Sequence, residues 1–199
     1  MTMNGLIKLI SLLAFVIFTN NAFAHSGHAE SVSFMAGILH PLTGWDHLLA
    51  ILLVSFWSAF TLKRAWLGPI LFMSGMGAGV ILGLTHFSIK WFELGVAISI
   101  VGLGLLIYIH QKSHLSLALG LIGLFGFFHG YAHADALGGA SNAMAPSISM
   151  DLLGLLIATA MLHGIGIVLG KRVHQFNQLA YKGVGISAVL VGLMMIFAP

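Results

Sequence analysis

Residues 40–47 of the chain read HPLTGWDH, and this polar stretch interrupts a segment, residues 31–62, that is otherwise apolar. As one helix that segment would be about 48 Å long, whereas the hydrocarbon core of a membrane is about 30 Å thick. Pro41 suits the first turn of a new helix and disfavours helical geometry at His40. The stretch therefore predicts a break before Pro41, with a short outer segment over residues 31–40 and a full span after it.

The composition of the whole chain is that of an integral membrane protein. Of its 199 residues, 59% are apolar and only 7% are charged, which no soluble domain of this size would show. Eight Lys and Arg residues against five Asp and Glu are too few for a surface that follows phosphates, so nucleic acid is excluded and the lipid bilayer is the expected partner. Because the chain has no Cys, a metal site must use nitrogen and oxygen ligands, and eleven His residues supply them.

These features predict an all-α fold: a polytopic membrane protein with six transmembrane helices after an N-terminal signal peptide. The predicted signal peptide, residues 1–24, ends in Ala-Phe-Ala, an A-x-A cleavage pattern. An uncleaved anchor is the alternative. Residues 25–199 then form one transmembrane domain. Its stretches of span length lie at about 41–62, 66–85, 91–109, 115–137, 150–170 and 179–197.

The positive charges predict the orientation of these spans. If the mature chain starts outside, the loops on the inner side carry six Lys and Arg residues, and those on the outer side carry only Lys90. Such an excess is typical of cytoplasmic loops. We therefore expect both ends of the mature chain to lie on the outer side, which for the expected location, the bacterial inner membrane, is the periplasm. Gly75, Gly79 and Gly83, and likewise Gly126 and Gly130, recur every fourth residue, which predicts close packing between helices.

Ionisable side chains inside the spans form two groups, one in the first span and one in the fourth. Such groups are costly in a membrane and are functional candidates by default. The bland alternative is that they join helices by hydrogen bonds. The first group is His40, Asp46 and His47, and the second is His129, His133 and Asp135.

The two groups lie at matching predicted depths. His47 is about 9 Å inside the outer start of its span, and His129 and His133 are about 12 and 6 Å from the outer end of theirs. Two helices meeting there would offer up to four imidazoles with one or two carboxylates, which suits Ni²⁺, Co²⁺, Zn²⁺ or Cu²⁺ and not Mg²⁺ or Ca²⁺. Asp135 points about 160° away from His133 on an ideal helix, so it ranks below the histidines.

Four further residues are candidates for handling a metal. Glu93, near the outer start of the third span, could be a ligand, a proton carrier or an interfacial carboxylate. His163 is about 20 Å down the fifth span, where it could be a relay, an inner ligand or a helix-to-helix hydrogen-bonding group. His25 and His28 follow the predicted cleavage site and could form an outer capture site.

Several stretches resemble one protein family. HPLTGWDH resembles the HPxxGxDH signature of the HupE/UreJ proteins, six-span permeases linked to nickel or cobalt uptake for hydrogenase and urease. FHGYAHADAL is similar to the FHGxAHGxE segment of that family, and WFELGVAISIVGLGLL and LHGIGIVLG resemble its third-span and later His-Gly segments. The chain departs from the family pattern at Ala134, where the family usually has Gly, and its carboxylate is Asp135, where the family usually has Glu. The resemblance covers essentially the whole mature chain.

The resemblance implies a metal-handling set with two supporting residues. The set is His40, Asp46, His47, His129 and His133, and the supporting residues are Glu93 and His163. The expected function is uptake of Ni²⁺ or Co²⁺ from periplasm to cytoplasm through a site between the first and fourth spans. The ion is the transported substrate, no organic cofactor and no enzymatic activity are expected, and a hydrogenase or urease maturation pathway would lie downstream.

Two other classes of function stay open on the residues. A membrane metalloenzyme or haem-binding redox protein could use H-x-x-x-H on a helix, although no HExxH motif is present to supply a general base. A metal sensor or assembly factor would bind the ion without net flux. The sequence also leaves open whether the protein forms a homo-oligomer.

Overall fold

The computed structural model describes residues 32–85, 87–109, 114–136, 146–174 and 178–197, and within these ranges the chain forms seven helices and no strand. The predicted signal peptide, His25 and His28 lie outside the described residues. The helices are α2 (Phe34–Thr43), α3 (Trp45–Thr61), α4 (Leu67–Gly83), α5 (Phe92–Ile109), α6 (Leu115–Ala136), α7 (Pro146–His174) and α8 (Gln178–Phe197).

A helix forms at each of the six predicted spans. Among the described residues, α5, α6 and α7 are long and apolar enough to cross a membrane, and α2 and α3 together would make a fourth, broken span. Helix α4 and residues Tyr181–Phe197 of α8 are apolar but shorter. The all-helical membrane architecture is thus confirmed, with three or four helices of spanning length.

The prediction that the first span breaks before Pro41 is wrong, because the break lies three residues later, at Gly44. Pro41 is inside α2, and the axes of α2 and α3 differ by 75°. Near the end of a ten-residue helix the missing N–H of a proline costs one hydrogen bond, and the last turn is closed by other groups. The N–H of Gly44 donates to the carbonyl of His40 over 2.9 Å, and the hydroxyl of Thr43 donates to the carbonyl of Leu39 over 3.1 Å.

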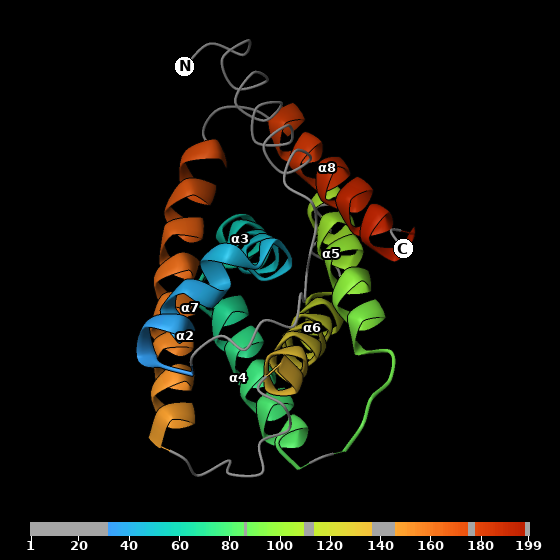
Figure 1. Ribbon diagram of the computed structural model, residues 1–199. Helices are drawn as coiled ribbons and strands as arrows, with labels where there is room; N and C mark the ends of the chain where they lie inside the picture. Colours follow the sequence, from blue (N-terminus) through green and yellow to red (C-terminus); the bar gives the residue numbers. More distant parts are fainter. Residues whose placement is uncertain (1–31, 86, 110–113, 137–145, 175–177, 198–199) are drawn as a thin grey trace.

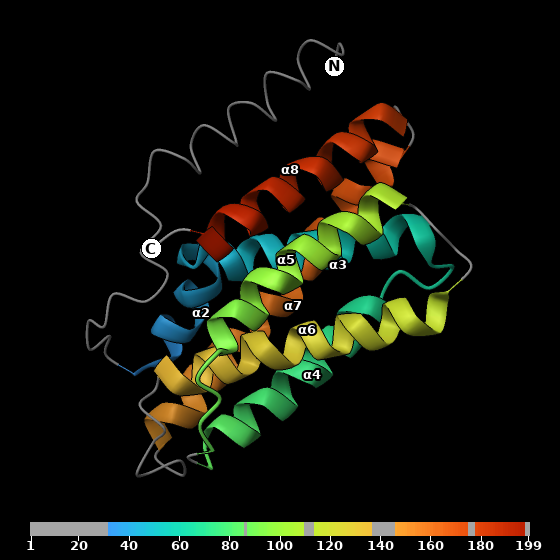
Figure 2. The ribbon, with the colours of Figure 1, turned by 90° about the vertical axis from the view of Figure 1, so that its right-hand side faces the viewer.

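Glycine faces bring α4 and α6 into backbone contact, as the spacing predicts. A Cβ on Gly126 would collide with the carbonyl of Phe72, and one on Gly130 would collide with the carbonyl of Met76. Figure 2 shows the two helices side by side along their length. Only residues without side chains allow so close an approach, so these glycines set the distance between α4 and the histidine-bearing helix α6.

The remaining helices surround α3. Helix α7 packs against both α2 and α3, and α8 packs against α5 (Figures 1 and 2). Ala50, Val54 and Trp57 of α3 are buried, whereas large apolar side chains such as Ile81 and Met161 are exposed on outward faces. An apolar exterior fits helices that face lipid. The interior around α3 is where the polar side chains gather.

Candidate metal site

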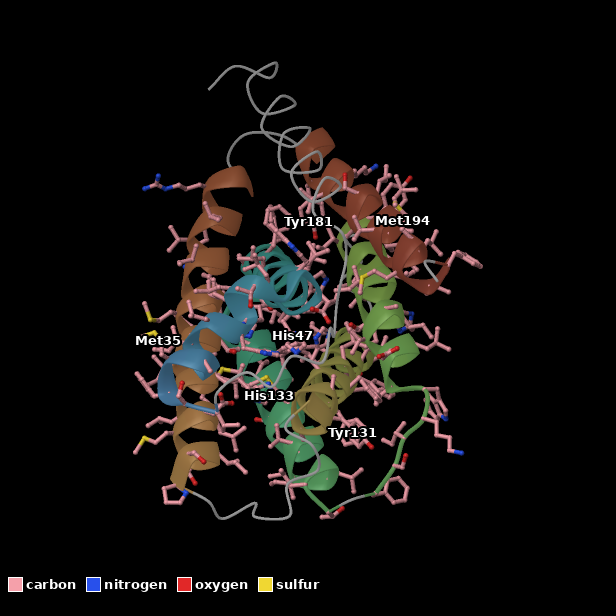
Figure 3. All side chains as sticks on the ribbon, in the orientation of Figure 1. Met35, His47, Tyr131, His133, Tyr181 and Met194 are labelled. Atoms are coloured by element: carbon pink, nitrogen blue, oxygen red, sulfur yellow. The ribbon has the colours of Figure 1, made fainter. Side chains whose placement is uncertain are left out.

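Four imidazole rings form a continuous row in the interior. The ring centroids of His133 and His40 are 4.6 Å apart, those of His40 and His47 are 5.0 Å apart, and those of His47 and His129 are 4.9 Å apart. Each neighbouring pair meets edge to face. Figure 3 shows the labelled His47 and His133 in the middle of the helix assembly. The histidines of the two groups, which lie about 80 residues apart in the sequence, therefore form one cluster.

The bend at Gly44 determines how the first group enters this row. His40 is on α2 and His47 is on α3, so they meet across the 75° bend and do not share one helix face. A Cβ on Gly44 would lie 3.2 Å from Oδ1 of Asp46, 3.3 Å from the carbonyl oxygen of His40 and 3.6 Å from Nδ1 of His47. Glycine therefore lets the backbone approach the polar groups of the site at the break.

Two of the four imidazoles in the row each have a carboxylate partner. Oδ1 of Asp46 is 3.0 Å from Nδ1 of His47, and Oδ2 of Asp151 is 3.1 Å from Nε2 of His133. All four side chains are buried. Asp46 also lies in the first turn of α3, where a negative charge is favoured by the helix dipole. The two carboxylates offset positive charge that a cation would bring into the interior.

A serine hydroxyl contacts each of two further histidines. Oγ of Ser99, on α5, is 2.9 Å from Nε2 of His129. Oγ of Ser55, on α3, is 2.6 Å from Nδ1 of His163. All four residues are fully buried. A hydrogen-bonding partner on one ring nitrogen, most often a carboxylate, a backbone carbonyl or water, is the usual means by which proteins orient imidazoles for a metal.

His163 lies beyond the four-imidazole row, with Phe72 between. The Phe72 ring centroid is 5.5 Å from that of His129 and 5.6 Å from that of His163. Phe72 comes from α4 and is almost fully buried. The rings thus run in the order His133, His40, His47, His129, Phe72, His163.

Four of these histidines have one nitrogen engaged and the other bare. Among the described residues, the buried imidazole nitrogens without a hydrogen-bond partner include Nε2 of His47, Nδ1 of His129, Nδ1 of His133 and Nε2 of His163. When one nitrogen of a neutral imidazole donates its proton to a partner, the other carries a lone pair that can bind a metal. Buried polar atoms are costly to leave unpartnered, which makes these four nitrogens candidate ligands.

The histidines and carboxylates of the cluster do not converge on a single point. Within the described ranges, no three His, Asp or Glu side chains are gathered closely enough to hold one metal ion. The donors follow one another in a row and do not form a closed cage.

Of the two remaining predicted candidates, Glu93 is not part of the row, and the side chain of Asp135 is not among those described. Glu93 is exposed in the first turn of α5, and no hydrogen bond or ion pair joins it to the described histidines. Asp135 belongs to α6, but its side chain lies outside the described part of the structure. Counted along FHGxAHGxE, the glutamate position falls on Ala136, so Asp135 is not its positional equivalent.

The sequence analysis does not identify three residues that contact the histidines, which are Asp151, Ser99 and Ser55. One signal was available for Asp151, an acidic residue at the outer start of the fifth predicted span and thus at the predicted height of His133. The serines carry no such signal, since Ser is common in membrane helices as a packing residue. The contacts of these serines with His129 and His163 depend on how the helices pack.

Comparison with known proteins gives two matches that cover nearly the whole chain. A family model described as HupE / UreJ protein matches residues 13–195. The chain is also 32% identical over 193 residues to Protein HupE of Rhizobium leguminosarum bv. viciae, an alignment that covers 95% of this chain and 97% of that relative. No solved structure matches significantly.

Proposed function

The chain belongs to the HupE/UreJ family, which is generally associated with nickel and cobalt transport, and from this we propose that it is a permease for Ni²⁺ or Co²⁺. The ion would pass from the periplasm to the cytoplasm through the row of histidines contributed by α2, α3, α6 and α7. The sequence placed this site between the first and fourth spans, and the proposal extends it to the fifth because Asp151 contacts His133.

The single observation that carries the proposal is the row of imidazoles whose orientation is fixed by partners on one ring nitrogen. Each of His47, His129 and His133 has one ring nitrogen held by a partner and one bare nitrogen inside the apolar interior. Nitrogen donors suit Ni²⁺ and Co²⁺ and are poor ligands for Mg²⁺ or Ca²⁺. Helix-to-helix hydrogen bonding alone would not require a bare nitrogen on each of these three rings.

The proposed topology follows from the charge asymmetry of the loops. All six helical segments from α3 to α8 would cross the inner membrane, with α2 as the short outer part of the first span and both mature ends in the periplasm. Residues 1–24 would serve as the signal peptide. Inward movement of a divalent cation would then be favoured by the membrane potential, by about 2.3 kcal/mol per charge per 100 mV.

The use of the ion follows from the family. HupE/UreJ proteins are linked to metal ions and to accessory functions of hydrogenase and urease. The proposed permease would supply the ion to such a maturation pathway. It would carry out no chemical conversion of its own.

The test is uptake of radiolabelled Ni²⁺ and Co²⁺ by proteoliposomes with an inside-negative potential, in the absence and presence of competing Zn²⁺ or Cu²⁺. We expect uptake by the native chain and its loss in His47→Ala. His114→Ala is the matched control, because His114 is exposed at the start of α6. Equal uptake by the native chain and His47→Ala would contradict the proposed site. Binding without net flux would indicate a sensor or assembly factor, and a Soret band in the purified protein would indicate haem.

A further inference from the structure

Two buried serines have the same pair of contacts, although they lie on different helices. The hydroxyl of Ser99 donates to the carbonyl of Val96 over 2.6 Å and also contacts His129. The hydroxyl of Ser55 donates to the carbonyl of Ile51 over 2.8 Å and also contacts His163. Each hydroxyl is thus placed between a carbonyl oxygen of its own helix and an imidazole nitrogen of another.

The single proton of each hydroxyl decides the direction of both contacts. A serine hydroxyl has one O–H donor and two acceptor lone pairs. Two oxygens that approach within 2.6 or 2.8 Å need a proton between them, and a carbonyl cannot provide it. The hydroxyl proton therefore lies toward the carbonyl, and the hydroxyl oxygen accepts a hydrogen bond from the imidazole.

The two histidines are consequently held in opposite tautomers. His129 carries its proton on Nε2, which contacts Ser99, and its bare nitrogen is Nδ1. His163 carries its proton on Nδ1, which contacts Ser55, and its bare nitrogen is Nε2. In both cases the nitrogen that the serine leaves bare is one without a partner among the described residues.

We propose that Ser99 and Ser55 are positioning residues of the transport site, each fixing the tautomer of one histidine so that its bare nitrogen is presented to the ion. This inference rests on the proposed function. Outer partners of ligating histidines typically change metal affinity or activity by about 10- to 100-fold when they are removed. The serines would do for His129 and His163 what the carboxylates of Asp46 and Asp151 do for His47 and His133.

Ser58 provides a matched control within the same molecule. It lies on α3, three residues from Ser55, and is equally buried, but its hydroxyl has no hydrogen-bond partner among the described residues. Ser58→Ala therefore removes the same atom from the same helix without removing a contact to an imidazole. Burial of a serine is common to both positions, and only the contact to histidine differs.

The experiment compares Ser99→Ala, Ser99→Thr, Ser55→Ala, Ser55→Thr and Ser58→Ala in two measurements. The first is Ni²⁺ and Co²⁺ uptake by proteoliposomes. The second is ¹⁵N NMR of the full-length chain labelled in histidine, which distinguishes the two neutral tautomers, with signals assigned by their loss in His129→Ala and His163→Ala. Threonine keeps a hydroxyl that can bond to the carbonyl three or four residues earlier.

We expect Ser99→Ala and Ser55→Ala to lower uptake at limiting ion concentration by about 10-fold or more. The threonine variants should recover part of this uptake. Ser58→Ala should take up the ion as the native chain does. The NMR signal of His129 should change from the Nε2–H form to a mixture in Ser99→Ala, and that of His163 should change from the Nδ1–H form in Ser55→Ala.

The two measurements separate the inference from the function on which it rests. Native uptake and native tautomers in both alanine variants would overturn the positioning role. If the native chain moves no ion but its tautomers still depend on Ser99 and Ser55, the proposed transport fails and the tautomer control stands. A loss of uptake in Ser58→Ala equal to that in Ser55→Ala would also overturn the positioning role, since burial alone would then explain the effect.

Discussion

The carboxylate of Asp151 on α7 lies 3.1 Å from Nε2 of His133 on α6, so the start of one helix orients a side chain near the end of the preceding one. The same part of α7 also approaches α2, because a Cβ on Gly37 would collide with the backbone carbonyl of Asp151. One turn of α2 further on, His40 contacts the ring of His133. Asp151 thus marks the point where three helices meet at one end of the histidine row.

Asp151→Asn should weaken Ni²⁺ binding by about 10- to 100-fold, because it removes the charge that orients and polarises His133. The amide oxygen of the new side chain can still accept a hydrogen bond, so the fold should be retained. Titration of the purified protein with Ni²⁺ measures the change. Asp135→Asn is the comparison that the sequence suggests, and a larger loss there than in Asp151→Asn would assign the carboxylate to Asp135.

Gly44→Ala should impair transport more than Pro41→Ala, although proline is the residue that normally breaks helices. A Cβ at position 44 would lie 3.2 Å from Oδ1 of Asp46 and 3.3 Å from the carbonyl oxygen of His40, so these groups must shift slightly, and misplaced site groups slow a reaction or transport step. Pro41→Ala only restores an N–H inside α2. Initial uptake rates of the two variants test this, and an equal loss in both would contradict a special requirement for glycine at position 44.

His163→Ala should slow uptake at saturating Ni²⁺ while the affinity measured by titration stays near that of the native chain. The outer four-imidazole row is left intact, and His163 lies beyond Phe72. A barrier raised by about 1.4 kcal/mol slows passage about tenfold, and removal of a ligand from an ion in an apolar interior should cost at least that much. Thr159→Val is the control on the same helix, since Thr159 is buried and its hydroxyl has no partner among the described residues. A proportional loss of affinity would instead place His163 in the binding site.

Gly130→Ala should lower the unfolding temperature, because the new methyl group would collide with the Met76 carbonyl at the α4–α6 contact. Overpacking of this kind costs about 1–3 kcal/mol. Gly77→Ala and Gly120→Ala are the controls on the same two helices, since a Cβ at either position meets nothing within 4 Å. Thermal unfolding in detergent, followed by intrinsic fluorescence, measures the difference. If all three variants unfold alike, the glycine contact is not a determinant of stability.

The helices were predictable because burial in lipid demands continuous apolar segments whose backbone is satisfied internally. The predicted spans at 66–85, 91–109 and 115–137 differ from the ends of α4, α5 and α6 by two residues or fewer. The position of the break was not predictable from Pro41. Local hydrogen bonds of Thr43 and Gly44 close the last turn of α2, and residue propensity does not report on them.

The contact between the two histidine groups was predictable from depth, and the partners of the histidines were not. His47 and His129 meet as the matched heights suggest. Which residue contacts the other nitrogen of each ring depends on helix rotation and on the neighbour across the interface. Ser99 reaches His129 from α5, and Asp151 reaches His133 from α7.

The sequence by itself determined an all-helical membrane protein with two groups of ionisable side chains in its apolar segments, because apolar length and the cost of buried charge can be read along a chain. Only the tertiary structure decided that His40 and His47 meet across a bend at Gly44, that Asp151 belongs to the cluster, and that each described histidine with an engaged nitrogen has a bare one opposite it. Those features depend on distances of about 3 Å between side chains of different helices, and such distances are fixed by how the helices pack.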